Sequence, residues 1–146
     1  MVEKFTSAPL ELPPAGQRFE RADLIFYGVD HSGPSFEARV FFDSRGVSHG
    51  AGSGHRAHVG SFFIFGHNGC FGDIGHCDIP RERDPFDLRP AHQLEPALRV
   101  LTVTEAVRGL LERGLDEAKV TVTAHTAGKA SDAVLGFETV RLATYA

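Results

Sequence analysis

Two cysteines and two histidines share one short glycine-rich stretch, and their side chains are the ones in this chain that could do chemistry. They are His67, Cys70, His76 and Cys77. Thiolate and imidazole are donors that Cu(I) and Zn(II) accept readily. The His67-x2-Cys70 spacing also lets two donors converge from a single turn. The stretch therefore predicts a copper or zinc site with these four residues as ligands.

Three other interpretations of the same cysteines remain open. Cys70 and Cys77 could close one small disulfide ring, which would stiffen the loop. They could also be inert buried thiols, because Cys-x6-His-Cys is not a standard zinc spacing. A cysteine-hydrolase site would need a histidine base oriented by Asp73 or Asp78, although such sites usually draw their members from separate elements. The same two acids could instead orient a ligating imidazole.

Further histidines flank this stretch. His55 and His58 lie in the preceding loop, and they could add ligands if that loop folds over the cysteines. Otherwise they are solvated loop residues. His92 is a further ligand candidate on the C-terminal side. The chain contains no dinucleotide-binding, P-loop or nucleophile-elbow motif, so the sequence nominates no catalytic residue.

Alternating apolar and polar residues predict the strands that must position these side chains. The predicted strands are residues 21–29, 35–43, 59–65, 98–103, 119–125 and 137–143. The turn at Asp30–Pro34 predicts that the first two form an antiparallel hairpin. Thr104 and Gly114 predict the N-cap and the C-terminal end of a short helix over residues 105–113.

This order of elements predicts an all-β fold. Because helices do not alternate with the strands, we expect an antiparallel β-sandwich, jelly-roll-like, with about six to seven strands and one short helix. The 146 residues fit a single domain at 19–146, preceded by an extended N-terminal tail at 1–18. Loops over 44–58 and 66–97 flank one strand, and long loops in a compact domain tend to be functional.

Four aromatic residues cluster around the cysteine loop: Phe62, Phe63, Phe65 and Phe71. Alternation places Phe63 and Phe65 on one face of the strand and Phe62 on the other. Phe has no polar group to satisfy, which favours a place in the core. One of these residues, or Phe71 in the loop, could instead project as a plug into the active site of a partner.

Charge and targeting signals narrow the class of partner. The formal net charge of −4 argues against binding to nucleic acid or an anionic membrane. The N-terminus lacks the apolar stretch of a secretory signal and no segment reaches the length of a membrane span, so we expect a cytoplasmic chain. A reducing compartment disfavours a lasting disulfide and favours thiols or metal ligands at both cysteines.

Four stretches follow one another in an order that is typical of one known domain: residues 21–43, 59–67, 102–111 and 118–124. They resemble the opening hairpin, the next strand, the short helix and the penultimate strand of the C-terminal β-sandwich (accessory) domain of type-3 copper proteins, the tyrosinases and molluscan haemocyanins. That next strand often reads Ala-Gly-Ser-Phe, and here it reads Val59-Gly-Ser-Phe62. The segment Phe65–Asp78 is similar to a variant found in bacterial tyrosinase-like proteins.

The resemblance implies an accessory domain as a stand-alone chain. The family's catalytic domain is a helical bundle whose histidines hold two coppers, and this sequence places no pair of histidines on a helix. The accessory domain is implied to cover the copper site and, in some members, to assist copper loading through a pair of cysteines. We therefore expect a non-catalytic module whose partner is a type-3 copper oxidase or a second copy of the chain. A small free-standing metalloenzyme and a copper-delivery protein are the alternatives.

Overall fold

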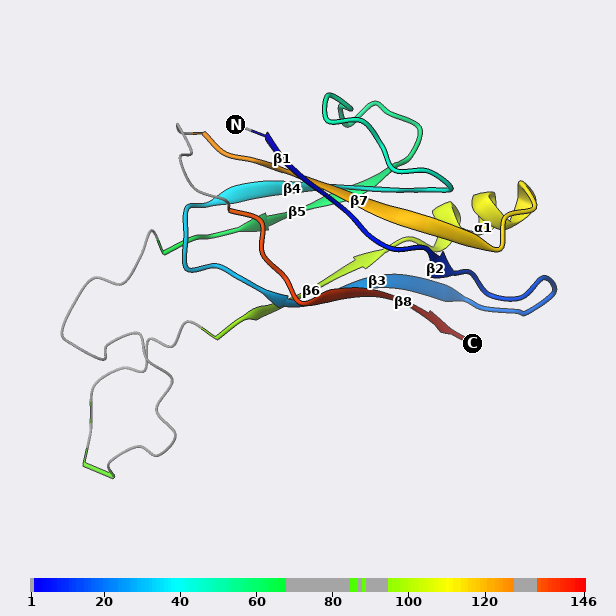
Figure 1. The fold of residues 1–146 in the computed structure, drawn as a ribbon. Helices are drawn as coiled ribbons and strands as arrows, with labels where there is room; N and C mark the ends of the chain where they lie inside the picture. Colours follow the sequence, from blue (N-terminus) through cyan, green and yellow to red (C-terminus); the bar gives the residue numbers. More distant parts are fainter. Residues whose placement is uncertain (1, 68–84, 87, 89–94, 128–133) are drawn as a thin grey trace.

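The fold is a sandwich of two antiparallel sheets (Figure 1). The structure is a computed structural model, and it describes residues 2–67, 85, 86, 88, 95–127 and 134–146. Its elements are β1 (Val2–Thr6), β2 (Leu10–Glu11), β3 (Arg21–Val29), β4 (Phe36–Asp43), β5 (His58–Ile64), β6 (Ala97–Thr102), α1 (Thr104–Glu112), β7 (Glu117–His125) and β8 (Thr139–Tyr145). The expected all-β sandwich is confirmed, with eight strands and one helix among the described residues.

The larger sheet has the order β1-β7-β4-β5, and β2 pairs with the start of β7. Alternation decides which side chains of this sheet point into the sandwich. Ala38 and Val40 of β4 lie opposite Ala124 and Val122 of β7, and all four are fully buried. The polar residues between them face away from the core, as the sequence pattern predicts.

The smaller sheet has the order β6-β3-β8, with β3 in the centre. Leu24 and Phe26 of β3 are fully buried. The Phe26 ring lies 5.1 Å from the ring of Phe62, which belongs to the opposite sheet. Phe137 approaches Phe26 edge-on at 5.5 Å and also contacts Phe5, so aromatic contacts tie the two sheets together.

The hairpin predicted for β3 and β4 is wrong, because the two strands belong to different sheets. Both edges of β3 are taken by β6 and β8, and both edges of β4 by β5 and β7. The turn at Asp30–Pro34 therefore crosses from one sheet to the other. Gly28, with a φ of +66°, precedes this crossing, where the register between β3 and β6 also shifts.

The prediction of an extended tail over residues 1–18 also needs correction. Val2–Thr6 forms the edge strand β1 against β7, and Leu10–Glu11 pairs with the start of β7. The Glu3 carboxylate accepts hydrogen bonds from the N–H groups of Val134 and Leu135, at 2.8 and 2.9 Å. These segments are too short to carry a readable alternation, which is why the pattern missed them.

The helix α1 begins differently from the prediction. Val103 is the N-cap and makes no side-chain capping bond. The Thr104 hydroxyl instead accepts the N–H of Ala22 at 3.0 Å, which ties the helix to β3. The predicted C-terminal end is confirmed: Gly114 has a φ of +77° and donates to the Leu111 carbonyl. No helix in the described part of the chain is long and apolar enough to cross a membrane.

The aromatic residues in and directly after β5 divide between the core and the surface. Phe62 is 8% exposed and belongs to the core, whereas Phe63 is 66% exposed and Phe65 is 87% exposed. A core position for Phe63 and Phe65 is therefore wrong. β5 is the edge strand of its sheet, and its outward face has no covering element among the described residues.

Candidate functional site at the base of the cysteine loop

Most of the predicted ligands fall outside the described residues. These ligands are Cys70, His76, Cys77 and His92. The possible orienting acids Asp73 and Asp78, and Phe71, also lie outside the described residues. The choice between a metal site and a Cys70–Cys77 disulfide therefore stays a prediction. His67 is described, and so is Glu95, which stands shortly before β6. These two residues define the base of the cysteine loop.

The N-terminal side of this base is fixed by a close backbone approach. The Gly66 N–H donates to the Ser35 hydroxyl at 3.0 Å. A Cβ atom on Gly66 would lie 2.0 Å from the carbonyl oxygen of Gly33 and 2.3 Å from the carbonyl carbon of Pro34. Only glycine can occupy this position, because any side chain would collide with the backbone of the β3–β4 turn.

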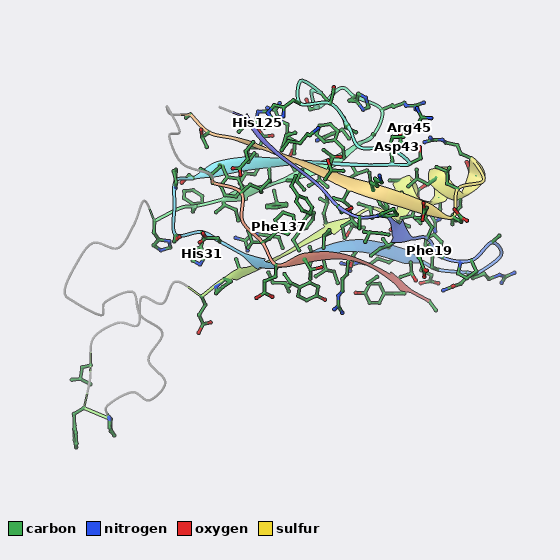
Figure 2. The ribbon with its side chains drawn as sticks, viewed as in Figure 1. Phe19, His31, Asp43, Arg45, His125 and Phe137 are labelled. Carbon is green, nitrogen blue, oxygen red and sulfur yellow. The ribbon has the colours of Figure 1, made fainter. Side chains whose placement is uncertain are left out.

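His31, on that same turn, contacts both sides of the base. The His67 N–H donates to the His31 carbonyl at 3.0 Å, and the two Nδ1 atoms lie 3.2 Å apart. The other ring nitrogen of His31, Nε2, faces the backbone carbonyl of Glu95. Figure 2 shows His31 at the end of the sandwich where β3 turns toward β4.

These contacts determine which ring nitrogen of His31 carries the proton. A carbonyl oxygen can only accept, so Nε2 must be the donor toward Glu95. In the neutral ring, Nδ1 of His31 then presents its lone pair to His67. The Nδ1 of His67 consequently donates, and it also lies 3.3 Å from the His31 carbonyl oxygen.

The charge beside the pair is negative. The Asp30 carboxylate accepts the N–H of Ser32 at 2.9 Å. This backbone hydrogen bond lowers the pKa of Asp30, and the neighbouring His31 lowers it further, although partial burial opposes them. Asp30 is therefore ionised at neutral pH and favours a cation nearby.

Sequence reasoning missed His31. It reads as an ordinary member of an Asp-His-Ser-Gly-Pro turn, separated from His67 by 36 positions. Spacing along the chain cannot bring the two together. To find the contact, one must know that the β3–β4 turn and the end of β5 lie at the same end of the sandwich. The incorrect prediction of a β3–β4 hairpin did not give this arrangement.

His55 and His58 lie elsewhere. His58 begins β5, whereas His67 follows the end of that seven-residue strand, so the two are separated by about 20 Å along it. Both rings pack on Phe41, at centroid distances of 6.0 and 5.5 Å. The structure does not bring them to His67. Within the described ranges, no group of three or more His, Cys, Asp or Glu side chains is arranged to hold a metal.

A polar network covers the outer face of β4, β5 and β7, but it is not a catalytic triad. The Ser61 hydroxyl donates to Glu37 at 3.2 Å, so its single proton is not shared with His58, whose Nε2 is 3.4 Å away. Hydrogen bonds from Arg39 lower the pKa of Glu37. Burial and the charge of Arg39 lower the pKa of His125 on β7. The network is one of charged pairs without an activated nucleophile.

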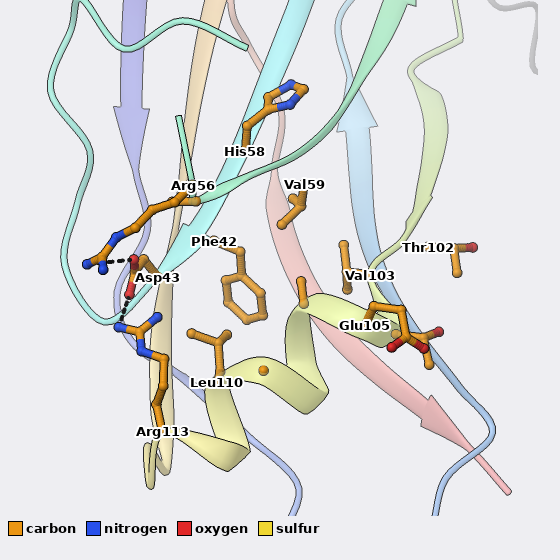
Figure 3. Close-up of a pocket in the computed structure, with 14 residues that line it drawn as sticks. Phe42, Asp43, Arg56, His58, Val59, Thr102, Val103, Glu105, Leu110 and Arg113 are labelled. Carbon is orange, nitrogen blue, oxygen red and sulfur yellow. Dashed lines mark hydrogen bonds and ion pairs between the residues drawn. The ribbon is translucent and has the colours of Figure 1, made fainter. Parts of the chain in front are cut away.

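An open cavity of about 530 Å³ lies between α1 and the start of β5 (Figure 3). Its floor is apolar, and Asp43 stands at its rim between two arginines. Arg113 donates to Asp43 at 2.9 Å, and Arg56 lies 3.7 Å away. Burial raises the pKa of Asp43, but the hydrogen bonds from Arg113 and the Ser44 N–H outweigh it and hold that pKa below its usual range.

Comparison with known proteins identifies the fold. No protein-family model matches the sequence, and no curated protein sequence matches it. Among solved structures, a latent aurone synthase (polyphenol oxidase) from natural source is 14% identical, with a TM-score of 0.58 over 97% of this chain and 24% of that one. Its recombinantly expressed form is 13% identical, with the same TM-score and coverage. A co-crystal of the recombinant form with hexatungstotellurate(VI) is 14% identical, with a TM-score of 0.58 over 98% and 24% of the two chains.

These similarities show a shared fold. The chain corresponds to about a quarter of the length of the polyphenol oxidases that it matches. The sandwich expected from the resemblance to tyrosinase-type proteins is therefore confirmed as a fold.

Proposed function

We propose that this chain is a non-catalytic accessory module that packs against a type-3 copper oxidase and carries a metal-binding His/Cys loop. The observation that supports the module is one of coverage. Nearly the whole chain, 97%, superimposes on a piece that makes up only 24% of a polyphenol oxidase.

The docking face of the module is the outer side of the edge strand β5. Phe63 lies on β5 and Phe65 directly follows that strand, and both side chains are exposed. Buried aromatic anchors supply much of the binding energy in protein interfaces. The outer edge of β5 pairs with no strand among the described residues, and such an edge can add backbone hydrogen bonds to the partner.

Capture of the partner tests the module. Affinity-tagged protein, incubated with extract of its source cells, should recover a type-3 copper oxidase that is identified by mass spectrometry. The variant Phe63→Ser/Phe65→Ser should lose that oxidase while it remains folded. If only a second copy of the chain is recovered, the module self-associates and does not bind an oxidase. Diphenol oxidation by the copper-loaded chain alone would overturn the non-catalytic assignment.

The metal-binding part rests on His67, Cys70, His76 and Cys77, whose sulfur and imidazole donors suit copper or zinc. Elemental analysis of untagged protein, purified without chelator, should give one metal per chain together with two reduced thiols. Cys70→Ser should then lose the metal while the sandwich stays folded. If the protein contains no metal and no free thiols, the two cysteines form the Cys70–Cys77 disulfide instead.

The same loop supports a second candidate function, which is copper delivery. The facing imidazoles of His31 and His67 favour it, because they place nitrogen donors at the base of a loop that carries two cysteines. Delivery predicts reversible Cu(I) binding that depends on both cysteines and transfer of the copper to an acceptor protein. A metalloenzyme would instead retain the metal and turn over a substrate.

A further inference from the structure

We propose that the cavity between α1 and the start of β5 binds a small organic carboxylate with an apolar body, an aryl or alkyl acid. The proposal goes beyond the accessory role and the cysteine loop, because the cavity lies at the other end of β5 from His67. Its volume of about 530 Å³ falls within the range of small-molecule sites. Such sites are mostly apolar and carry a few polar groups that orient the ligand.

The floor of the cavity would hold the apolar body of the acid. Phe42, Val103 and Leu110 line it, and each is at most 3% exposed. Val59 of β5 adds a further aliphatic side chain (Figure 3). Because these side chains come from the larger sheet and from α1 with the residue before it, they form a fixed concave surface. Removal of apolar ligand surface from water onto this floor favours binding.

Gly109 keeps one wall of the cavity low. It stands inside α1, where glycine is less stable than alanine because it loses more conformational freedom on folding. Neither backbone nor packing requires a glycine here: its φ is not positive, and a Cβ would meet no atom within 4 Å. Gly109 lines the cavity, so a larger side chain would take up cavity space. The glycine therefore preserves room for a ligand at the expense of helix stability.

The rim beside this floor carries a net positive charge. The single carboxylate of Asp43 lies between the guanidinium groups of Arg56 and Arg113, which leaves one positive charge in excess. Glu105 also lines the cavity, but its ion pair with Arg108 offsets its charge. An excess positive charge beside an apolar floor favours an anionic ligand with an apolar body.

Arg56 is the better placed of the two arginines to hold the carboxylate of the ligand. Its Nη2 lies 3.7 Å from the Asp43 carboxylate, beyond hydrogen-bond distance, whereas Arg113 donates to Asp43 at 2.9 Å. The Arg56 side chain is also 78% exposed, so it can turn toward the cavity without losing a hydrogen bond to Asp43. A guanidinium group binds a carboxylate through two parallel hydrogen bonds.

Titration of the full chain with two acids tests the site. Amide NMR would follow the addition of 3-phenylpropionate and of octanoate, which carry an aryl and an alkyl body. Both should bind saturably and shift the amide signals of Val103, Gly109 and Leu110. 3-Phenylpropionamide has the same body without the charge, and acetate has the charge without the body. Each of these two should bind about tenfold more weakly, or less.

Substitutions test where the acid binds. Arg56→Gln should weaken binding about tenfold. The matched control is Arg45→Gln, which removes the same charge from the same loop but outside the cavity, and it should leave binding unchanged. Gly109→Leu should fill the cavity and abolish binding. Gly109→Ala should raise Tm by about 2–4 °C, and Gly109→Leu should be at least as stable as wild type, so lost binding would not reflect unfolding.

The contrary outcomes are distinct from those of the proposed function. Absence of saturable binding of both acids by wild type would overturn the site. Equal affinity for 3-phenylpropionate and its amide would overturn the carboxylate assignment, and unchanged binding by Gly109→Leu would place the ligand outside the cavity. If neither acid binds and Gly109→Leu also fails to capture the oxidase, the cavity belongs to the interface with that partner. Metal content and capture by wild type test the proposed function separately.

Discussion

Gly66 approaches Gly33 so closely that a Cβ on Gly66 would lie 2.0 Å from the Gly33 carbonyl oxygen. Backbone cannot move aside as a flexible side chain can, so Gly66→Ala must displace the base of the cysteine loop from the β3–β4 turn. We expect the free energy of unfolding to fall by about 2–3 kcal/mol, measured by urea denaturation.

Gly33→Ala is the matched control, because a Cβ at Gly33 would meet no atom within 4 Å. That variant should unfold at nearly the same urea concentration as wild type. Equal stability of Gly66→Ala and Gly33→Ala would contradict the close contact.

Asp43 should contribute to stability through its ion pair with Arg113. Asp43→Asn keeps the shape of the side chain but removes the charge that faces Arg113 at 2.9 Å. We expect a loss of about 2 kcal/mol at pH 7, since hydrogen bonds to charged groups are among the stronger ones. Glu105→Gln removes an exposed i,i+3 pair with Arg108 and should cost about 0.5 kcal/mol or less.

The same pair gives a pH dependence with a definite sign. The pKa of Asp43 in the folded protein lies below its usual value of 3.8, so the unfolded chain takes up the proton first as the pH falls. The contribution of Asp43 is present at pH above about 4 and is lost progressively below it. Urea denaturation at pH 7 and at pH 3 should show the difference between wild type and Asp43→Asn shrinking at the lower pH. A constant difference would argue against the charged pair.

Phe62 and Phe63 are neighbours with opposite roles. Phe62 packs on Phe26 in the core, and Phe62→Ala should cost about 3–5 kcal/mol. Phe63 is 66% exposed, and Phe63→Ala should cost less than about 1 kcal/mol. Thermal unfolding of the two variants tests this difference. Similar losses of stability in both variants would mean that Phe63 is buried.

Thr104 links α1 to β3 through its hydroxyl. Thr104→Val leaves the Ala22 N–H without its acceptor, and Ala22 is fully buried. We expect a loss of about 1–3 kcal/mol, the usual penalty for a buried unsatisfied donor. Thr104→Ser retains the hydroxyl and should recover most of that loss in the same denaturation assay. Equal stability of Thr104→Val and wild type would contradict the buried hydrogen bond from Ala22 to the Thr104 hydroxyl.

Local patterns in the sequence were enough to locate most elements of the fold. The alternation of Phe36, Ala38, Val40 and Phe42 predicts β4, and Gly114 correctly marks the end of α1. Strand pairing did not follow, because β3 pairs with β6 and β8, which are distant in the sequence. Alternation also defines two faces of β5 without telling which one the other sheet covers, and Phe63 was misplaced for that reason.

The candidate site was predictable only in part. His67 could be named from its spacing to Cys70, since both belong to one stretch of chain. His31 could not, because its contact with His67 depends on where the β3–β4 turn lies in space. Thr104 fails for a related reason: its hydroxyl has two possible acceptor roles, and the tertiary bond to Ala22 replaces the local cap.

The position of His31 has a consequence for how this protein can be altered. One imidazole touches His67 and the Glu95 carbonyl, so the chain leaves the sandwich and re-enters it at almost the same place. Doubling the number of residues between two such fixed points costs only about 0.6 kcal/mol in closure entropy. The segment between them can therefore serve as a replaceable cassette. A peptide exchanged into it would be displayed at the end of the sandwich near Phe65, with the sheets left as they are.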